Sequence, residues 1–261
     1  MQSQSVDIVL VSPRNPLNIG AAARAMANFG FSNLSVVNPY TPHWREARSA
    51  VGAPDLLQSA REFATLSEAL AHNTLVIGTG TLAHRKPEQK GVQLPHLAPI
   101  IRQELVRDAR IALVFGPEKH GLTREDLSWC HLLVEIPTDP RQPSMNLGQA
   151  VAVCLYELSS RAFAHPSAEA GTQSSPVVPI LVTPPARETP APRSANLDLL
   201  AGVIEETMQA AGYSPTLMQS ANRHDLRLLL RRLAASERDT RRMLGLFRRI
   251  LFRLKQSPKR E

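Results

Sequence analysis

The sequence predicts an α/β domain built on a mainly parallel sheet, followed by a linker and a small helical unit. Three observations carry this prediction. Short apolar runs alternate with helical patterns through residues 1–163, as expected of parallel strands joined by crossover helices. Prolines and small residues dominate residues 164–194, which is the composition of a linker. Three amphipathic helical patterns then fill residues 195–261, so a helical extension is expected there.

Each predicted strand is a short apolar run that ends at a turn residue. These runs lie at residues 6–11, 34–37, 74–80, 111–115 and 132–136. Helical patterns separate or follow them at residues 18–29, 54–70, 96–108, 123–126 and 146–161. The first helix is rich in alanine and ends at Gly30, and the short fourth one begins with a capping-box pattern at Thr123.

A polar loop joins the last of these strands to the last helix of the domain. Pro137, Pro140 and Pro143 exclude regular structure there, because each proline fixes φ and removes a backbone donor. Ser144 and Asn146 follow at the point where the first turn of the helix leaves backbone N–H groups unpaired. This position suits both helix capping and ligand contact, and spacing alone favours capping.

The excess positive charge of the chain lies at its C-terminal end. The formal net charge is +7 over all 261 residues. Residues 223–261 contain 13 Lys or Arg against 4 Asp or Glu, a net +9, whereas residues 1–222 contain 17 against 19, a net −2. Such a segment indicates a polyanionic partner such as nucleic acid, although solvated basic helices without a partner are also common.

The last helical pattern has two distinct faces. Its apolar side comprises Met243, Phe247, Ile250, Leu251 and Leu254. Its basic side comprises Arg241, Arg242, Arg248, Arg249 and Arg253. Two interpretations remain open for this basic side, a solvated face of a helix bundle and a face that binds RNA phosphates.

Several classes of protein and site are excluded by simple patterns. No apolar run approaches the length of a membrane span, and residues 1–15 lack the regions of a signal peptide, so we expect a cytoplasmic protein without membrane contact. Cys130 and Cys154 lie in apolar surroundings and are expected to be core residues. The histidines lack ligand spacing, which predicts no metal site. Residues 116–123 have the glycine spacing of a phosphate loop, but Leu122 stands where that loop requires Lys.

Three polar segments begin at strand ends, where α/β domains bind their ligands. They read NPLNIGAAARAMANFG from residue 15, LVFGPEKHGL from residue 113 and IPTDPRQPSMNLGQAVAVCLYE from residue 136. In this order and spacing they resemble the three motifs of the SPOUT class of S-adenosylmethionine-dependent RNA methyltransferases, and within it the TrmJ-like tRNA ribose 2′-O-methyltransferases. The resemblance covers about residues 5–162. The basic tail is similar in kind to the helical C-terminal extension of bacterial members, which would bind RNA.

The resemblance implies a fold and a cofactor that composition does not reveal. It implies a deep trefoil knot in the C-terminal part of the α/β domain, and a homodimer whose active site is assembled across the interface. The cofactor S-adenosyl-L-methionine would be held by Thr79, Gly80, Thr81, Gly116, Ile136, Pro143, Ser144 and Met145. Backbone groups of bent loops and apolar side chains suit a cofactor that has no phosphate.

The resemblance also implies a reaction, the attack of a ribose 2′-hydroxyl on the methyl of a sulfonium. Arg24, Ser144 and Asn146 would surround the nucleophile. Glu118 would have a supporting, hydrogen-bonding role. Because a guanidinium stays protonated at ordinary pH, we expect Arg24 to bind the adjacent RNA phosphate and stabilise the developing alkoxide instead of acting as a base.

The expected substrate is a pyrimidine nucleotide of tRNA, at position 32 of the anticodon loop. Two alternatives stay open. One is the same chemistry on ribosomal RNA or at another tRNA site, since motifs specify the reaction better than the substrate. The other is a non-catalytic RNA-binding protein that has kept the fold, which would not bind S-adenosylmethionine.

Overall fold

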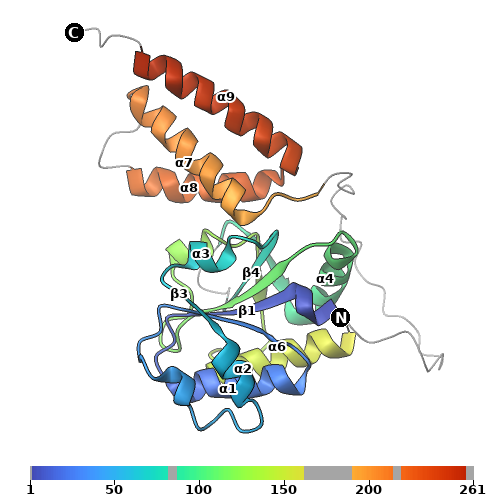
Figure 1. Ribbon diagram of the computed structural model, residues 1–261. Coiled ribbons are helices and arrows are strands. Elements are labelled where there is room, and N and C mark those ends of the chain that lie inside the picture. The colour runs from blue at the N-terminus through green and yellow to red at the C-terminus, as the bar shows by residue number, and fades with distance from the viewer. Residues whose placement is uncertain (1, 82–86, 162–189, 214–218, 257–261) are drawn as a thin grey trace, which may run out of the picture.

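A seven-stranded, all-parallel sheet forms the centre of the α/β part of the chain. The computed structural model describes residues 2–81, 87–161, 190–213 and 219–256 (Figure 1). The strands are β1 (Val6–Val11), β2 (Asn33–Val37), β3 (Arg61–Phe63), β4 (Leu75–Thr79), β5 (Lys90–Gln93), β6 (Ile111–Phe115) and β7 (Leu132–Glu135). Their order across the sheet is β3-β2-β1-β6-β4-β7-β5, and every neighbouring pair is parallel.

Helices cover both faces of this sheet (Figure 1). One face packs on α1 (Pro16–Asn28), α2 (Pro54–Ser59), α4 (Leu97–Val106) and α6 (Leu147–Arg161). The other face packs on α3 (Leu66–Leu70) and α5 (Arg124–Leu127). Single turns of 3-10 helix lie at η1 (Gln2–Ser5), η2 (Trp44–Glu46) and η3 (Leu94–His96). Because side chains alternate along a strand, Ile8 and Leu10 enter the first core while Val9 and Val11 enter the second.

The sheet order brings three strand ends together. β6 lies between β1 and β4, and β7 lies between β4 and β5, although both follow β5 in the chain. The strands β6, β4 and β7 are therefore neighbours, and parallel strands end at the same edge of a sheet. The loops that follow them, at residues 79–81, 116–123 and 136–146, meet there.

The predicted strands are confirmed, but two short edge strands were missed. β3 and β5 carry mainly exposed side chains, so they show no apolar run. The single helix predicted for residues 54–70 is wrong, because α2, β3 and α3 divide that stretch. Thr65 begins α3 with a capping box that it forms with Glu68. The first helix also begins earlier than predicted, because Asn15 is its N-cap and accepts from the N–H of Leu17.

Three helices form the C-terminal extension, α7 (Ser194–Ala210), α8 (Gln219–Leu233) and α9 (Glu237–Gln256). Their shared core comprises Leu197, Leu200, Ala201, Ile204 and Leu230, with Met243, Leu244 and Phe247 packed against it. Ile250 was expected on the apolar side of the last helix, but its side chain is exposed. Most of the predicted linker lies outside the described residues. None of the helices described in the structure is long and apolar enough to span a bilayer.

The extension packs on its own α/β domain, on the side of α3 and α5 (Figure 1). The first turn of α7 donates two backbone hydrogen bonds to the domain, from Ser194 to the carbonyl of Asn73 and from Ala195 to that of Ala71. The guanidinium of Arg227 lies over the Trp129 ring at 4.0 Å from its centroid. These contacts hold the helical extension at the turns that follow α3 and α5.

Candidate active site

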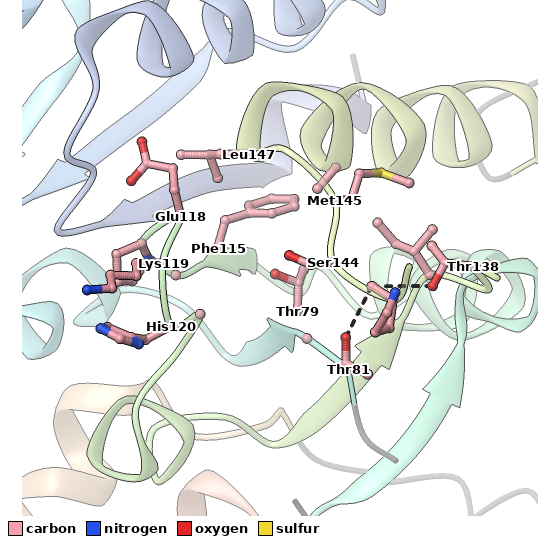
Figure 2. Close-up of a pocket in the computed structure, with 17 residues that line it drawn as sticks. Thr79, Thr81, Phe115, Glu118, Lys119, His120, Thr138, Ser144, Met145 and Leu147 are labelled. Atoms are coloured by element: carbon pink, nitrogen blue, oxygen red, sulfur yellow. Dashed lines mark hydrogen bonds between the residues drawn. The ribbon is translucent and has the colours of Figure 1, made fainter. Parts of the chain in front are cut away.

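A pocket of about 240 Å³ opens where β4, β6 and β7 end (Figure 2). All eight residues that the resemblance assigns to the cofactor line it: Thr79, Gly80, Thr81, Gly116, Ile136, Pro143, Ser144 and Met145. Glu118 lines it as well. Eight further lining residues were not predicted: Phe115, Pro117, Lys119, His120, Gly121, Thr138, Leu147 and Ala150. Each of these eight residues lies within the second or third motif segment. The whole segments therefore predicted the lining of the pocket more completely than the individual residues selected from them.

The loop after β7 is held in place by two threonine hydroxyl groups. Thr81 and Thr138 both donate to the carbonyl of Pro143, at 3.4 and 3.3 Å (Figure 2). The next residue, Ser144, is exposed and its side chain has no hydrogen-bond partner among the described residues. The hydroxyl of Ser144 is therefore available to a ligand in a loop whose position is fixed.

Two of the predicted cofactor residues also have structural tasks. A Cβ on Gly116 would lie 2.2 Å from the backbone nitrogen of Leu122 and 2.3 Å from the carbonyl carbon of Gly121. The loop after β6 folds back on itself at this point, so it requires glycine whether or not a ligand is bound. The hydroxyl of Thr79 donates to the carbonyl of Val114 at 3.0 Å, and its hydrogen is thus already used within the sheet.

A directed chain of hydrogen bonds joins the three motif segments. Asn18 donates from Nδ2 to Glu118 Oε1 at 2.8 Å. Asn146 donates from Nδ2 to Asn18 Oδ1 at 2.9 Å. The Oδ1 atom of Asn146 accepts from the N–H groups of Gly148 and Gln149 and so caps α6. The carboxylate of Glu118 can only accept hydrogen bonds, and the N–H groups at the start of α6 can only donate them. These two ends of the chain therefore fix the orientation of both amide side chains.

Glu118 also holds the loop between β1 and α1. Its carboxylate accepts from the backbone N–H groups of Arg14 at 3.0 Å and Asn15 at 3.1 Å. Burial raises the pKa of Glu118, but the hydrogen bonds from Asn18, Arg14 and Asn15 outweigh this effect and leave that pKa below its ordinary value. The charged form of Glu118 is thus the one that this arrangement stabilises.

Arg24 does not line the pocket of its own chain. It is exposed on α1, six residues or about 9 Å along the helix from Asn18. Within the described part of the chain its guanidinium has no hydrogen-bond or ion-pair partner. Of the four predicted catalytic residues, Ser144 and Glu118 therefore meet at the pocket, Asn146 joins them through Asn18, and Arg24 stands apart.

Besides Arg24 on α1, the other five predicted RNA-binding arginines are all exposed on α9, which is the outer helix of the extension in Figure 1. Arg241 pairs with Glu237 at 2.9 Å, and Arg242 lies 3.9 Å from Asp239. The guanidiniums of Arg248 and Arg249 have no such partner among the described residues. Of the five predicted arginines on α9, these two are the most available to an anion.

The described residues contain no group of three or more His, Cys, Asp or Glu that could hold a metal ion. Both cysteines are buried, and burial raises the pKa of Cys130 and of Cys154 to about 12. Both thiols stay neutral at physiological pH, so neither is an activated nucleophile.

Comparisons with known proteins agree with this geometry. The model of the SpoU rRNA Methylase family matches residues 5–156. The tRNA (cytidine/uridine-2′-O-)-methyltransferase TrmJ of Escherichia coli K12 is 33% identical over 261 residues, which span 98% of this chain and 97% of that protein. The tRNA (cytidine/uridine/adenosine-2′-O-)-methyltransferase TrmJ of Pseudomonas aeruginosa UCBPP-PA14 is 42% identical over 154 residues, 59% of this chain but only 60% of that relative's length.

A solved structure extends the similarity to both parts of the chain. The crystal structure of TrmJ from Z. mobilis ZM4 superposes with a TM-score of 0.76 at 28% identity. The match covers 94% of this chain and 98% of that one, so it includes the helical extension. The chain therefore belongs to the SpoU rRNA methylase family, and within it to the TrmJ-like methyltransferases.

Proposed function

We propose that this protein transfers the methyl group of S-adenosylmethionine to the ribose 2′-oxygen of a cytidine or uridine in tRNA. The observation that carries the proposal is the meeting of the loops after β4, β6 and β7 at one pocket, with Ser144 exposed at its wall. The E. coli relative, which matches almost the whole chain, is named for this reaction. We propose position 32 of the anticodon loop as the target and the cytoplasm as the compartment.

The lining of the pocket fits the cofactor. Its apolar members Ile136, Met145 and Leu147 suit an adenine ring, and the tightly bent backbone at residues 79–81 and 143–145 suits recognition of ribose and base by peptide groups. Among the described residues that line the pocket, Lys119 is the only Lys or Arg, so the pocket is not built to bind phosphates. When bound, the cofactor supplies an electrophilic methyl group on a sulfonium.

The residues of the chain orient the nucleophile. Ser144 would hold the ribose hydroxyl by a hydrogen bond, while Glu118 and Asn146 keep the motif loops in register through Asn18. Arg24 would bind the neighbouring phosphate and stabilise the oxyanion as the proton leaves. The proton would pass to solvent or to an RNA phosphate oxygen, because a guanidinium is a poor base.

We further infer a homodimer, in which Arg24 reaches the pocket of a second copy. Two observations support this. Arg24 is exposed and does not line its own pocket, and the neighbouring surface of α1 and α6 exposes Leu17, Val153 and Tyr156. Apolar side chains on adjacent helices are typical of a surface covered by a partner. The strand order, with β7 inserted between β4 and β5, supports a knotted C-terminal half of the domain.

The extension would recruit tRNA through phosphates, with residues 1–163 as the methyltransferase domain, 164–194 as the linker and 195–261 as the RNA-binding unit. Arg248 and Arg249 support this proposal because their charges lack protein partners in the described part of the chain. Arg241, Arg242 and Arg253 extend the same face. Binding through phosphates weakens steeply with salt, since each neutralised phosphate releases counterions.

The test is transfer of labelled methyl groups to unmodified bulk tRNA, beside an Arg24→Ala variant, followed by digestion and identification of the labelled nucleoside. We expect 2′-O-methylcytidine or 2′-O-methyluridine with the wild type and loss of label with the variant. Fragment mapping then locates the nucleotide. Label on ribosomal RNA alone would show that the substrate is ribosomal RNA and not tRNA. If no RNA is labelled and the cofactor does not bind, the protein would be a non-catalytic RNA-binding protein.

A further inference from the structure

Two neighbouring strands end in the same turn. β1 and β2 pair in register up to Val11 and Val37. Residues 11–14 read VSPR and residues 37–40 read VNPY. The second residue of each turn is left-handed, with φ of 45° at Ser12 and 44° at Asn38. This conformation is uncommon for residues other than glycine, although asparagine adopts it more often than most, and strained residues cluster at functional sites.

The matching turns place Arg14 and Tyr40 side by side. The Cζ atom of Arg14 lies 5.8 Å from the centroid of the Tyr40 ring. The backbone beneath them is held, because Tyr40 donates to the carbonyl of Pro13 at 3.1 Å and Thr41 Oγ1 donates to that of Arg14 at 3.4 Å. A fixed backbone therefore presents a ring and a guanidinium next to each other.

Both side chains are free to meet a ligand. Tyr40 is 77% exposed. Within the described residues, the Arg14 guanidinium has no hydrogen-bond or ion-pair partner, and the Tyr40 hydroxyl has no hydrogen-bond partner. A single exposed tyrosine is ordinary on a protein surface. An exposed tyrosine beside an unpaired guanidinium, on two turns of unusual and matching geometry, is not.

This pair adjoins the candidate active site. The backbone N–H of Arg14 donates to the carboxylate of Glu118, which lines the pocket. Both turns lie at the edge of the sheet where β4, β6 and β7 also end. RNA whose ribose enters the pocket would therefore pass close to Tyr40.

We propose that Tyr40 and Arg14 form a stacking site for an unpaired nucleobase beside the methylated nucleotide. The proposal rests on the proposed function. Proteins read single-stranded RNA loops by stacking splayed bases on aromatic rings and guanidinium planes. The charge of Arg14 adds attraction to the phosphate that follows such a base. The ligand is thus an RNA loop, because in duplex RNA every base is already stacked.

The test couples the protein side chain to a single base. tRNA is assembled with one abasic nucleotide, placed in turn at each unpaired position of the anticodon loop. Its affinity is measured by filter binding with wild type, Tyr40→Ala, Tyr40→Leu and Tyr40→Phe, and methyl transfer is followed in parallel. Tyr40→Leu keeps apolar bulk without a π face, and Tyr40→Phe keeps the ring.

We expect Tyr40→Ala and Tyr40→Leu to weaken tRNA binding by about tenfold, and Tyr40→Phe by less than about threefold. One abasic position should weaken wild-type binding equally and have no further effect on Tyr40→Ala. The affinity of all four proteins for S-adenosylmethionine should match. Unchanged tRNA affinity of Tyr40→Ala would overturn the proposal. So would losses of affinity that simply add when Tyr40→Ala is combined with each abasic position. Absence of methyl transfer by the wild type would count against the proposed function alone, because binding is measured separately.

Discussion

Arg231 Nε donates a hydrogen bond of 2.9 Å to the main-chain carbonyl of Trp129, which joins α8 to the turn after α5. A second nitrogen of Arg231 lies 3.2 Å from Asp198 on α7. The arginine is only 5% exposed. Burial lowers the pKa of Arg231 and raises that of Asp198, and their mutual attraction opposes both shifts. The ion pair lies within the extension, between α8 and α7, whereas the hydrogen bond to Trp129 ties α8 to the α/β domain.

Replacing Arg231 should therefore destabilise the protein far more than replacing its neighbour. Arg231→Met leaves the mostly buried Asp198 without its partner, and we expect a loss of about 3 kcal/mol in the free energy of unfolding. Arg232 pairs with Glu88 in solvent, so Arg232→Met should cost less than about 1 kcal/mol. Urea titration followed by tryptophan fluorescence measures both. Equal losses in the two variants would mean that the buried pair contributes no special stability.

The amide of Asn18 should matter more for activity than for stability. Asn18→Ala removes the hydrogen bonds to Glu118 and from Asn146, and so separates the motif loops. Small misplacement of catalytic groups costs about 100-fold in rate, so we expect a fall of that order in kcat. Gln103→Ala removes an exposed amide on α4 and serves as the control. A kcat for Asn18→Ala within twofold of wild type would exclude a positioning role.

The contribution of Glu118 to stability should depend on pH with a definite sign. Its folded-state pKa is lowered, so its contribution is present above the ordinary value of 4.5 and is lost as the pH falls through the folded-state pKa. We expect Glu118→Gln to be less stable than wild type by about 1–3 kcal/mol at pH 7, because a neutral amide replaces an acceptor of three hydrogen bonds. Thermal melts at several values between about pH 3 and about pH 7 should show that this difference in stability shrinks at the acid end. A constant difference would contradict this assignment.

Much of the fold followed from local pattern. β1 and β6 are continuous apolar runs because both faces of their sheet are covered, and α6 follows a proline-broken loop. β3 and β5 were not predictable in this way, because an exposed edge strand needs no apolar periodicity. Most of the pocket walls followed from the second and third motif segments, since loops after neighbouring parallel strands must meet.

Contacts between distant polar residues left no signal in the sequence. Asn18 and Asn146 are 128 positions apart, and Arg231 and Trp129 are 102 apart. No periodicity links such pairs, and a buried arginine contradicts the general preference of arginine for the surface. The same holds for Arg14 and Tyr40, which become neighbours only because β1 and β2 end in register.

The arginines of α9 should contribute unequally to tRNA binding. Arg248 and Arg249 lack ion-pair partners among the described residues, whereas Arg241 and Arg242 lie next to Glu237 and Asp239. Because an arginine already paired must give up its carboxylate to bind a phosphate, the unpaired residues should release more free energy on binding.

We therefore expect the double variant Arg248→Gln, Arg249→Gln to weaken tRNA binding and to lower the slope of log affinity against log salt by about 2. The matched double variant Arg241→Gln, Arg242→Gln should lower it by less. Filter binding at several salt concentrations measures both slopes, and methyl transfer at saturating tRNA should stay near wild type in each. An unchanged slope for the first variant would show that α9 does not bind the phosphates of tRNA.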